Sequence, residues 1–453
     1  MKVVLIEPST KGSDVYGFFK LPLLGLPILG TILKQAGHDV QIYNERYSRV
    51  NPEKIEADIV GVSLLTRTAP RGYEILDSFR ERGIRTMAGG FHATFMPEEA
   101  LEHADYVCLG EGENSVLDIV EGRAERGIVE KREVDFANNP IPDFSLIVNG
   151  QENKGLLSRL INTPLYSMAT SRGCMGNCDF CSVTQMFGRR YRTVPIDRVV
   201  EEIDRGGATN IFFYDDNFAL KKKRTAEMMK EFYGRNITWS AQADVHVGDD
   251  LELLKSMYKA GCNYLYIGLE SVNPKTLKSY RKGQRIEDME RCIKNAHKAG
   301  IRIHGMFVIG SDDDSPETIA ETLRFCRRNH IETVQFLVLT PLPGTITYAR
   351  LSDRIVTRNW SLYDGHHAVF TPKNFTRKEL QEMTLKGMKK FYSWGRDIEA
   401  GMRGASDSFA NLFSGRYSEA RKRGGETLTN FITGIGARKM IKTGWEMLKR
   451  DKN

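Results

Sequence analysis

Residues 171–181 read SRGCMGNCDFC and place Cys174, Cys178 and Cys181 within eight positions. The segment follows an apolar run at 166–170 that is typical of a strand, so we expect a loop leaving a strand end. Three thiolates on one loop can bind three irons of a cubane cluster, which leaves the fourth iron without a protein ligand. A reactive metal centre needs such an open position, whereas a structural centre is closed. The spacing therefore predicts a 4Fe–4S cluster with one free iron.

Two other interpretations of these cysteines are weaker. A zinc knuckle would need a fourth Cys or His at suitable spacing, but the next cysteine is Cys262 and no histidine follows closely. Chance clustering does not account for Gly173 and Gly176, which let the loop fold tightly around a cluster. Strand, glycines and thiols together favour the cluster.

The pattern over residues 166–355 predicts a partial (β/α)6 barrel. Apolar runs alternate with amphipathic helical stretches, for example at Pro195–Asp204 and Ile286–Ala299. In such a barrel the chemistry takes place at the carboxyl ends of the strands. The expected strands are Tyr166–Thr170, Ile211–Tyr214, Trp239–Ala243, Tyr264–Gly268, Arg302–Val308 and Val334–Leu339.

Residues 1–135 predict a doubly wound, Rossmann-like α/β domain. Short apolar strands alternate with helices, and such parallel sheets bind ligands beyond the carboxyl ends of their strands. A linker is expected at 136–165, and residues 356–453 are expected to form a helical region with a basic tail. The five strands predicted in the first domain are Val3–Ile6, Asp39–Tyr43, Ala57–Leu65, Arg85–Ala88 and Tyr106–Leu109.

Composition excludes several classes of protein. The 453 residues are 41% hydrophobic and 27% charged, as in an ordinary globular chain. No apolar run approaches a membrane span, and MKVVLIEPST is typical of a buried strand rather than a signal peptide. We therefore expect a cytoplasmic protein. Seven cysteines in so long a chain do not suggest a disulfide framework, and the four outside the loop are expected to be buried thiols.

The CxxxCxxC spacing, with Phe180 before the last cysteine, resembles the radical S-adenosylmethionine superfamily over residues 166–350. The resemblance implies that the free iron chelates the amino and carboxylate groups of S-adenosylmethionine. One electron, from a donor such as flavodoxin or ferredoxin, would then release a deoxyadenosyl radical that abstracts hydrogen from a carbon.

The same resemblance suggests further S-adenosylmethionine contacts at the strand ends. Asp216 and Asn217 would meet the methionine amino group, although they stand in an Asp-Asp-Asn run rather than the family's Gly-Gly-Glu. Ribose and carboxylate contacts would fall at Gln242, Asp244 and Glu270. The alternative for each carboxylate is a helix N-cap or a solvated loop charge. A glycine-rich fifth strand ending at Gly310 would lie along the adenine.

The first domain resembles the cobalamin-binding subgroup, whose members are class B methyltransferase-like. Ser63 and Leu65 match its Ser-x-Leu element, Gly89 and Gly90 match its Gly-Gly element, and Glu111 follows on the same face. A hydroxyl and bare backbone would let the nucleotide tail of cobalamin enter between strand ends. The alternative is a degenerate flavodoxin-like docking domain that binds no cofactor.

The subgroup's Asp-x-His-x-x-Gly element is missing. Its place after the first strand holds Glu7–Asp14, which contains no histidine. We therefore predict that cobalamin binds without a histidine as lower ligand. His92 follows Gly90, but a loop histidine more often serves as a surface or hydrogen-bonding residue.

Together these features imply a cobalamin-dependent radical S-adenosylmethionine methyltransferase that uses methylcobalamin to methylate an unactivated carbon. Two alternatives remain open: a cyclase or coupling enzyme without net methylation, and a non-enzymatic iron–sulfur protein. The substrate also remains open. It could be a peptide or protein residue, such as the glutamine of methyl-coenzyme M reductase, or a lipid or other small molecule.

The basic charge is concentrated in the tail. Residues 414–453 carry ten Lys or Arg against four Asp or Glu, whereas the rest of the chain is nearly neutral. Such a segment can contact an anionic membrane surface, dock on an acidic protein, or pack on the barrel as a solvated helix. The neutral body argues against nucleic acid as a partner. The pair His366–His367 is expected to be a hydrogen-bonding loop rather than a metal site.

Overall fold

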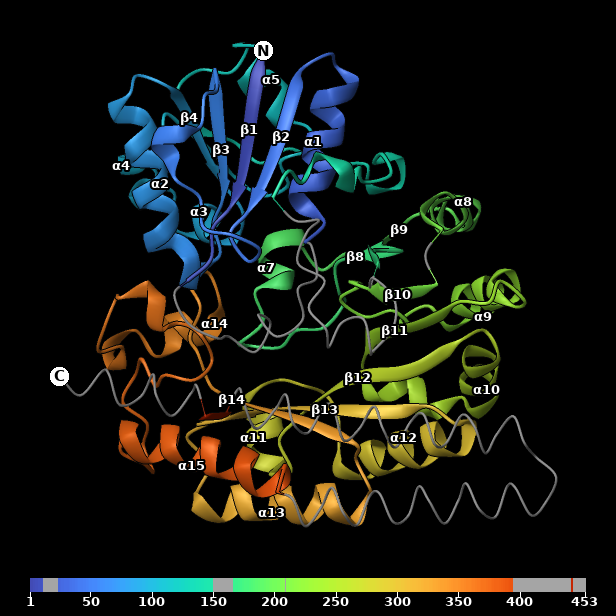
Figure 1. The fold of residues 1–453 in the computed structure, drawn as a ribbon. Coiled ribbons are helices and arrows are strands. Elements are labelled where there is room, and N and C mark those ends of the chain that lie inside the picture. The colour runs from blue at the N-terminus through green and yellow to red at the C-terminus, as the bar shows by residue number, and fades with distance from the viewer. Residues whose placement is uncertain (11–22, 150–165, 208, 394–440, 443–453) are drawn as a thin grey trace.

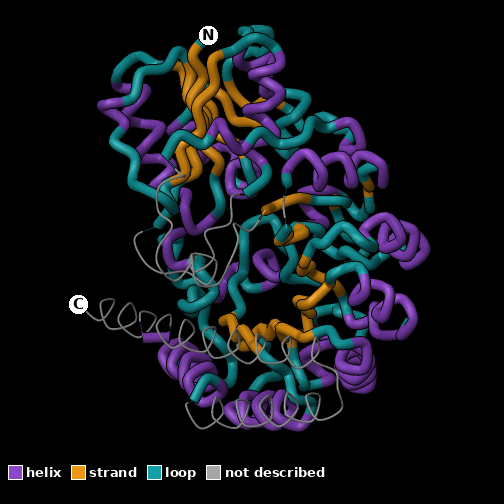
Figure 2. The backbone as a smooth tube through the Cα atoms, turned by 45° about the vertical axis from the view of Figure 1, so that its right-hand side comes forward, coloured by secondary structure: helices purple, strands orange, loops and turns teal. Residues whose placement is uncertain are grey.

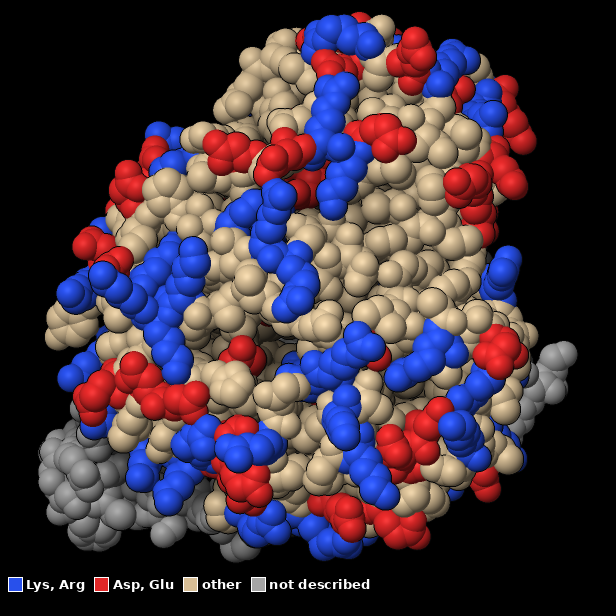
Figure 3. Space-filling model, turned by 180° about the vertical axis from the view of Figure 1, so that it is seen from behind, with Lys and Arg blue, Asp and Glu red and all other residues tan. Residues whose placement is uncertain are grey.

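The computed structural model describes residues 1–10, 23–149, 166–207, 209–393 and 441–442. Two parallel sheets, one of each predicted domain, lie one above the other in Figure 1. Most of the basic tail, and the second half of the expected linker, fall outside the described residues. Lys and Arg are interspersed with Asp and Glu on the face shown in Figure 3, which fits the nearly neutral charge of the body.

The first sheet has the strand order β2-β1-β3-β4-β5-β6, with all pairs parallel. The order reverses between β1 and β3, which is the switch point of a doubly wound sheet. The predicted fold class is therefore confirmed. The strands are β1 Lys2–Glu7, β2 Asp39–Asn44, β3 Ile59–Ser63, β4 Arg85–Gly89, β5 Tyr106–Cys108 and β6 Gly127–Val129.

Helices cover both faces of this sheet because its strands carry apolar side chains on both sides. Val3 and Leu5 pack with α1 and α5, whereas Val4 and Ile6 pack with α2 and α4. The α-helices of this part are α1 Gly25–Gln35, α2 Ala69–Glu81, α3 Phe91–Phe95, α4 Pro97–His103 and α5 Val116–Val120. Short 3-10 turns stand at η1 Pro52–Lys54, η2 Thr66–Thr68, η3 Phe136–Asn138 and η4 Phe144–Leu146.

The second sheet has the order β14-β13-β12-β11-β10-β7, again all parallel. It curves as an open six-stranded barrel, visible from the side in Figure 2, with its helices outside. The six strands agree with those predicted. They are β7 Tyr166–Met168, β10 Asn210–Phe213, β11 Thr238–Ala243, β12 Cys262–Glu270, β13 Arg302–Ile309 and β14 Thr333–Val338.

The remaining elements surround this barrel. A two-stranded antiparallel ribbon, β8 Ser171–Arg172 with β9 Arg192–Thr193, flanks the cysteine loop. The helices are α7 Val183–Phe187, α8 Ile196–Gly206, α9 Lys222–Phe232, α10 Leu251–Lys259, α11 Pro274–Ser279, α12 Ile286–Ala299, α13 Pro316–Arg328, α14 Ile346–Arg350 and α15 Arg377–Phe391. Three 3-10 turns complete the set, at η5 Val245–Asp249, η6 Ser352–Arg354 and η7 Trp360–Leu362.

After the barrel the chain returns to the first domain. Trp360 and Tyr363 join the core formed by β3 and α2, and Trp360 Nε1 donates a hydrogen bond of 2.7 Å to Glu99 Oε1. Residues 356–376 contain no α-helix, so the α-helical part of residues 356–393 is α15 alone. The Asp364 carboxylate accepts hydrogen bonds from the backbone of both His366 and His367, which makes this segment a tight hydrogen-bonded turn.

Glu202 on α8 gives the fold a pH dependence. Its side chain is 9% exposed and lies 3.5 Å from the hydroxyl of Tyr166, and burial raises its pKa to about 7 from 4.5. Between these two pH values the folded state holds a proton that the unfolded state has lost. The stability that Glu202 contributes is therefore complete below pH 4.5 and is lost as the pH rises to about 7. In the wild type the free energy of unfolding should fall by about 3 kcal/mol over that range because of Glu202. We expect this fall to be absent in Glu202→Gln.

Urea denaturation of the wild type and the variant at several pH values measures this difference. A difference between the two proteins that does not change with pH would contradict the prediction.

Candidate functional site

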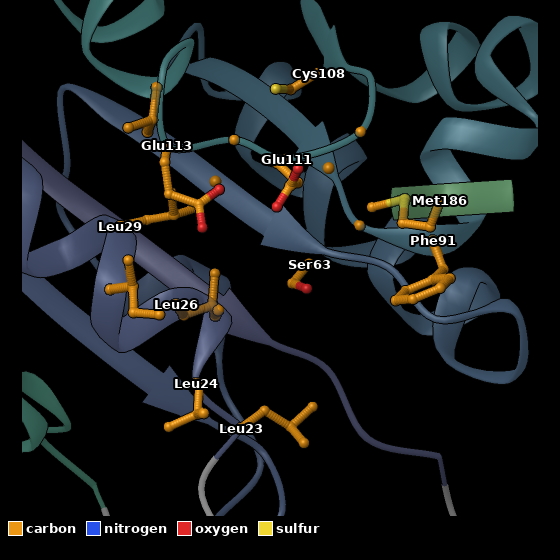
Figure 4. A pocket seen from close by; sticks show the side chains of 18 of the residues that line it. Leu23, Leu24, Leu26, Leu29, Ser63, Phe91, Cys108, Glu111, Glu113 and Met186 are labelled. Carbon is orange, nitrogen blue, oxygen red and sulfur yellow. The ribbon is translucent and has the colours of Figure 1, made fainter. Parts of the chain in front are cut away.

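A cavity of about 330 Å³ lies between the carboxyl ends of the first sheet and the start of the barrel. Figure 4 shows its walls, where leucines of the loop and helix after β1 face Phe91 and Met186. Residues of both domains line it, including Arg172, Tyr214 and Asp216 from the barrel. The cavity therefore extends from the strand ends predicted to hold cobalamin to Asp216, which is the one residue predicted to hold S-adenosylmethionine among the described lining residues.

All five residues predicted to contact cobalamin line this cavity: Ser63, Leu65, Gly89, Gly90 and Glu111. Gly90 has φ +93°, and a Cβ there would stand 2.9 Å from the carbonyl oxygen of Leu64. Only glycine therefore lets the β4 loop cross so closely over the end of β3.

The lining offers apolar walls and bare backbone, as a corrin with a nucleotide tail requires, and no histidine is among the described lining residues. His92 is fully buried elsewhere, with Nε2 3.2 Å from Glu99 Oε1.

Glu111 takes part in a buried ion-pair network between the two domains. Its carboxylate lies 2.5 Å from Arg172 Nη1 and 2.8 Å from Arg192 Nη1, and Glu113 lies 2.6 Å from Arg172 Nη1. The Arg172 guanidinium also stacks on the ring of Phe136 at 4.4 Å. Burial alone would lower the pKa of Arg172, but the two glutamates raise it. Glu111 thus fixes the start of the cysteine loop as well as lining the cavity.

The cysteine loop folds closely around its glycines. Gly173 has φ +90°, and a Cβ there would stand 2.2 Å from the carbonyl oxygen of Arg190. Gly176 donates its backbone N–H to Cys174 Sγ at 3.3 Å, and a Cβ on Gly176 would lie within 3.8 Å of the sulfurs of both Cys174 and Cys178. The loop therefore leaves a hollow beside the sulfurs that a larger side chain would fill.

The thiols fit a cubane better than a single ion. No group of three or more His, Cys, Asp or Glu within the described ranges surrounds one metal position. Thiolates of a cubane each bind a different iron, so they surround the cluster rather than meet at one point. Burial raises the pKa of all three thiols, that of Cys181 to about 11, whereas the charge of Lys282 lowers them.

Two adjacent aspartates hold this loop to the barrel. Asp216, predicted to meet the methionine amino group, accepts the backbone N–H of Gly173 at 2.7 Å, and burial raises its pKa to about 6. Asp215 was not predicted as functional. It is fully buried and accepts hydrogen bonds from Thr170 Oγ1 at 2.6 Å and Ser171 Oγ at 2.5 Å. Asp215 thus anchors the strand end from which the loop leaves.

Asn217 and Asp244 meet at the next strand ends, where Asn217 Nδ2 donates to Asp244 Oδ2 at 2.7 Å. Asp244 also caps η5 through the backbone of His246, which is the N-cap alternative. The backbone carbonyl of Gln242 accepts a hydrogen bond from Phe218 at 2.9 Å. The three residues are therefore brought to one edge of the barrel.

Glu270 ends β12 with φ +60°, outside the usual range for a glutamate, and pairs with Lys282 Nζ at 2.8 Å. Burial alone would lower the pKa of Lys282, but Glu270 and the nearby Cys178 raise it. Lys282 was missed because nothing in its spacing from Glu270 signals the contact. Its position gives a positive charge beside the cysteines and beside Glu270.

Gly310 lies somewhat apart from these groups. Its φ is +118°, its N–H donates to Asp314 Oδ2 at 3.0 Å, and a Cβ there would stand 2.9 Å from the side chain of Leu380 on α15. Glycine is therefore required where β13 passes under α15.

Comparison with known proteins agrees with this arrangement. The Radical SAM superfamily model matches residues 168–326, and the B12 binding domain model matches residues 18–120. Bacteriochlorophyllide d C-8(2)-methyltransferase from Chlorobaculum tepidum is 30% identical, over 80% of this chain and 84% of its own. This chain belongs to the cobalamin-binding radical S-adenosylmethionine methyltransferases. The predictions of an enzyme, and of a 4Fe–4S cluster, S-adenosylmethionine and cobalamin as its cofactors, are confirmed.

Other members of the family are similar over most of the chain. Bacteriochlorophyllide d C-12(1)-methyltransferase from the same organism is 29% identical, over 92% of this chain and 93% of its own. Among solved structures, the cobalamin-dependent S-adenosylmethionine radical enzyme OxsB superposes with a TM-score of 0.66 at 16% identity, covering 99% of this chain and 80% of its own. No helix among the described residues is long and apolar enough to cross a membrane.

Proposed function

We propose that this methyltransferase transfers a methyl group to an unactivated carbon of a cyclic tetrapyrrole. The observation that carries the proposal is the single cavity that runs from the Gly89–Gly90 loop to Asp216 at the barrel mouth. A methyl carrier at the first position and a radical source at the second would thus meet in one space. The two bacteriochlorophyllide d methyltransferases, which match most of this chain, support a tetrapyrrole as the substrate class.

In this proposal each predicted site residue helps to bind one of the cofactors. Cys174, Cys178 and Cys181 hold the cluster. The bound cofactors supply an electron for the cleavage of S-adenosylmethionine and a carrier for the methyl group. S-adenosylmethionine is held by Asp216, Asn217, Gln242, Asp244, Glu270 and Gly310, with Lys282 at its carboxylate.

Cobalamin is held by Ser63, Leu65, Gly89 and Gly90, without a histidine below the cobalt. Glu111 closes the same pocket while it holds Arg172 in place. We also propose that the chain is divided into its domains and linker at residues 135, 165 and 355. We propose that a reduced flavodoxin or ferredoxin is the electron donor. The enzyme would then work in the cytoplasm under anaerobic conditions.

Two other relatives support a different reaction or a different substrate class. Anaerobic magnesium-protoporphyrin IX monomethyl ester cyclase from Cereibacter sphaeroides is 25% identical over 86% of this chain, which supports ring closure without methylation. Hopanoid C-3 methylase from Methylococcus capsulatus is 26% identical over 82% of this chain, which supports a lipid.

Anaerobic reconstitution with iron, sulfide and hydroxocobalamin tests the proposal. The reduced enzyme is incubated with S-adenosylmethionine and either a bacteriochlorophyllide or a hopanoid, and the products are analysed by mass spectrometry. We expect a tetrapyrrole product heavier by one CH2, with the added carbon derived from the methyl group of labelled S-adenosylmethionine. A product without added carbon, or methylation of the hopanoid alone, would contradict it.

A further inference from the structure

The inner face of the barrel is only partly buried. Strand side chains alternate between the outer helices and the lumen. On β13, Ile303 and Phe307 are at most 1% exposed and belong to the outer core, whereas Arg302, His304 and Met306, which face the other way, are partly exposed. A lumen filled by its own side chains would bury both sets equally. The inner face of β13 is therefore less completely covered than its outer face, whereas Thr333 and Gln335 on the inner face of β14 are buried.

Three buried donor atoms on this inner face have no acceptor within the described residues, although the side chains of His304 and Gln335 interact with each other. Arg302 Nη1, His304 Nε2 and Gln335 Nε2 are buried atoms without a hydrogen-bond partner in the described part of the chain. Gln335 is 7% exposed, and its neighbours Val334 and Phe336 belong to the outer core, so its amide faces the lumen. An unmade hydrogen bond at a buried polar group is costly, which indicates a ligand that supplies acceptors.

The strand register brings these donors together. Residue 304 stands beside 333 and residue 306 beside 335, so Gln335 lies one step above His304 on the neighbouring strand. Arg302 precedes His304 by two residues and therefore shares its face.

A short chain of hydroxyl groups makes His304 Nε2 a donor. The Tyr264 hydroxyl lies 3.0 Å from Thr333 Oγ1, which in turn lies 2.8 Å from His304 Nδ1. If Tyr264 donates to Thr333, and Thr333 to Nδ1, the proton of a neutral imidazole is on Nε2. Burial lowers the pKa of His304 to about 4, although a hydrogen bond with the Gln335 side chain opposes this effect, so the ring is neutral at neutral pH.

Arg302 brings a positive charge that forms no ion pair within the described residues, and its Nε donates to the carbonyl oxygen of Asn263 at 3.5 Å. Its guanidinium stacks on the ring of Tyr264 at 4.7 Å, but none of the ion pairs among the described residues includes it. Glu332, the acidic residue beside this strand, instead lies 3.3 Å from His297 Nε2 and accepts the N–H of Ile303 at 2.9 Å. A partly buried cation without a counter-charge favours an anionic ligand.

We infer that Arg302, His304 and Gln335 form a binding site for a carboxylate of the substrate, deep in the barrel. The inference rests on the proposed function, because it places the other end of the same substrate. His304 precedes the end of β13 by five residues, or roughly 16 Å of strand. The substrate is therefore an extended apolar acid, with its carboxylate in the lumen and its methylated carbon at the strand ends.

A pair of probes that differ only in this group tests the site. Pheophorbide a carries one free carboxylate, and its methyl ester does not. We expect the reconstituted enzyme to bind the acid at least about tenfold more tightly than the ester, measured by quenching of probe fluorescence. Arg302→Gln and Gln335→Leu should each reduce this preference to about twofold or less.

Arg328→Gln is the matched control, because this exposed arginine pairs with Glu290 on the outside of the barrel. It should keep the full preference for the acid. The melting temperature of ligand-free Gln335→Leu should stay close to that of the wild type, since the amide Nε2 gives up no partner and only the interaction with His304 is lost. A structural glutamine would instead lower it by several degrees.

Equal binding of acid and ester, failure to bind either, or a lowered melting temperature of Gln335→Leu would overturn the inference. Methyl transfer from S-adenosylmethionine to cob(I)alamin, followed by its optical spectrum, needs no substrate in the lumen. If that transfer and tetrapyrrole methylation persist while the acid preference is absent, the carboxylate site is wrong and the proposed function stands.

Discussion

Replacing Cys174, Cys178 and Cys181 together by alanine is expected to abolish reductive cleavage of S-adenosylmethionine, with a loss of at least about a thousandfold. Each thiolate binds a separate iron, so no remaining side chain of the loop can keep the cluster in place. The measurements are iron and acid-labile sulfide per chain and the yield of deoxyadenosine after reduction with dithionite.

Cys262→Ala is the matched control, because this thiol is 1% exposed within the outer core of the barrel and far from the loop in sequence. It should leave iron content and cleavage unchanged. A triple variant that retained iron, or that still formed deoxyadenosine, would show that the cluster is held elsewhere.

The same thiols should make cluster assembly depend on pH. Burial raises their pKa values, to about 11 for Cys181, so each proton must be displaced when iron binds. Metal binding and deprotonation are linked, and reconstitution should therefore be more complete at pH 8.5 than at about pH 6.5. The triple variant would show no such dependence.

Most strands of both sheets were predictable because each is an apolar run that can be recognised from neighbouring residues alone. The strand β6 was missed, since it has only three residues, Gly127–Val129, and charged residues flank it. Its place in the sheet comes from pairing with β5, which no local pattern reveals. The return of Trp360 to the first domain was missed for the same reason, because its partner Glu99 is 261 positions away.

The candidate site was predictable wherever a motif is contiguous. The cysteine loop and the Gly89–Gly90 element are such motifs, and both lie at strand ends as expected. The contacts between motifs were not predictable. Asp215 reads like its neighbour Asp216 in sequence, but only one of the two is fully buried under the loop. Lys282 stands in a charged turn whose folding alone brings it to Glu270.

Glu111 illustrates how a predicted residue acquires a second role in the folded chain. The sequence places it at a strand end beside glycines, which is typical of a ligand loop. Folding adds Arg172, which is 61 positions away, and Arg192, which is 81 positions away. The strand end of one domain is thereby connected to the cysteine loop of the other through charges that neither segment could bury alone.

Arg172→Leu is expected to destabilise the protein by about 3–5 kcal/mol, because it leaves two buried carboxylates without their shared partner. The side chains of Glu111 and Glu113 are only 4% and 8% exposed, so water cannot replace the guanidinium. Urea denaturation of the reconstituted enzyme at pH 7.5 measures the loss. Arg190→Leu is the matched control, since its pair with Glu133 crosses the same interface at 65% and 77% exposure. It should cost about 1 kcal/mol or less.

The pH dependence of the Arg172→Leu variant separates lost charge from lost packing. In the variant Glu113 loses its cation and Glu111 keeps only Arg192, so these buried carboxylates should bind protons more readily as the pH falls toward 5. The variant's deficit in the free energy of unfolding should then shrink relative to the wild type, whereas a deficit due to lost stacking on Phe136 would not change. A constant deficit across pH 5 to 8 would therefore refute the assignment of this cost to Glu111 and Glu113, and with it their role in joining the two domains.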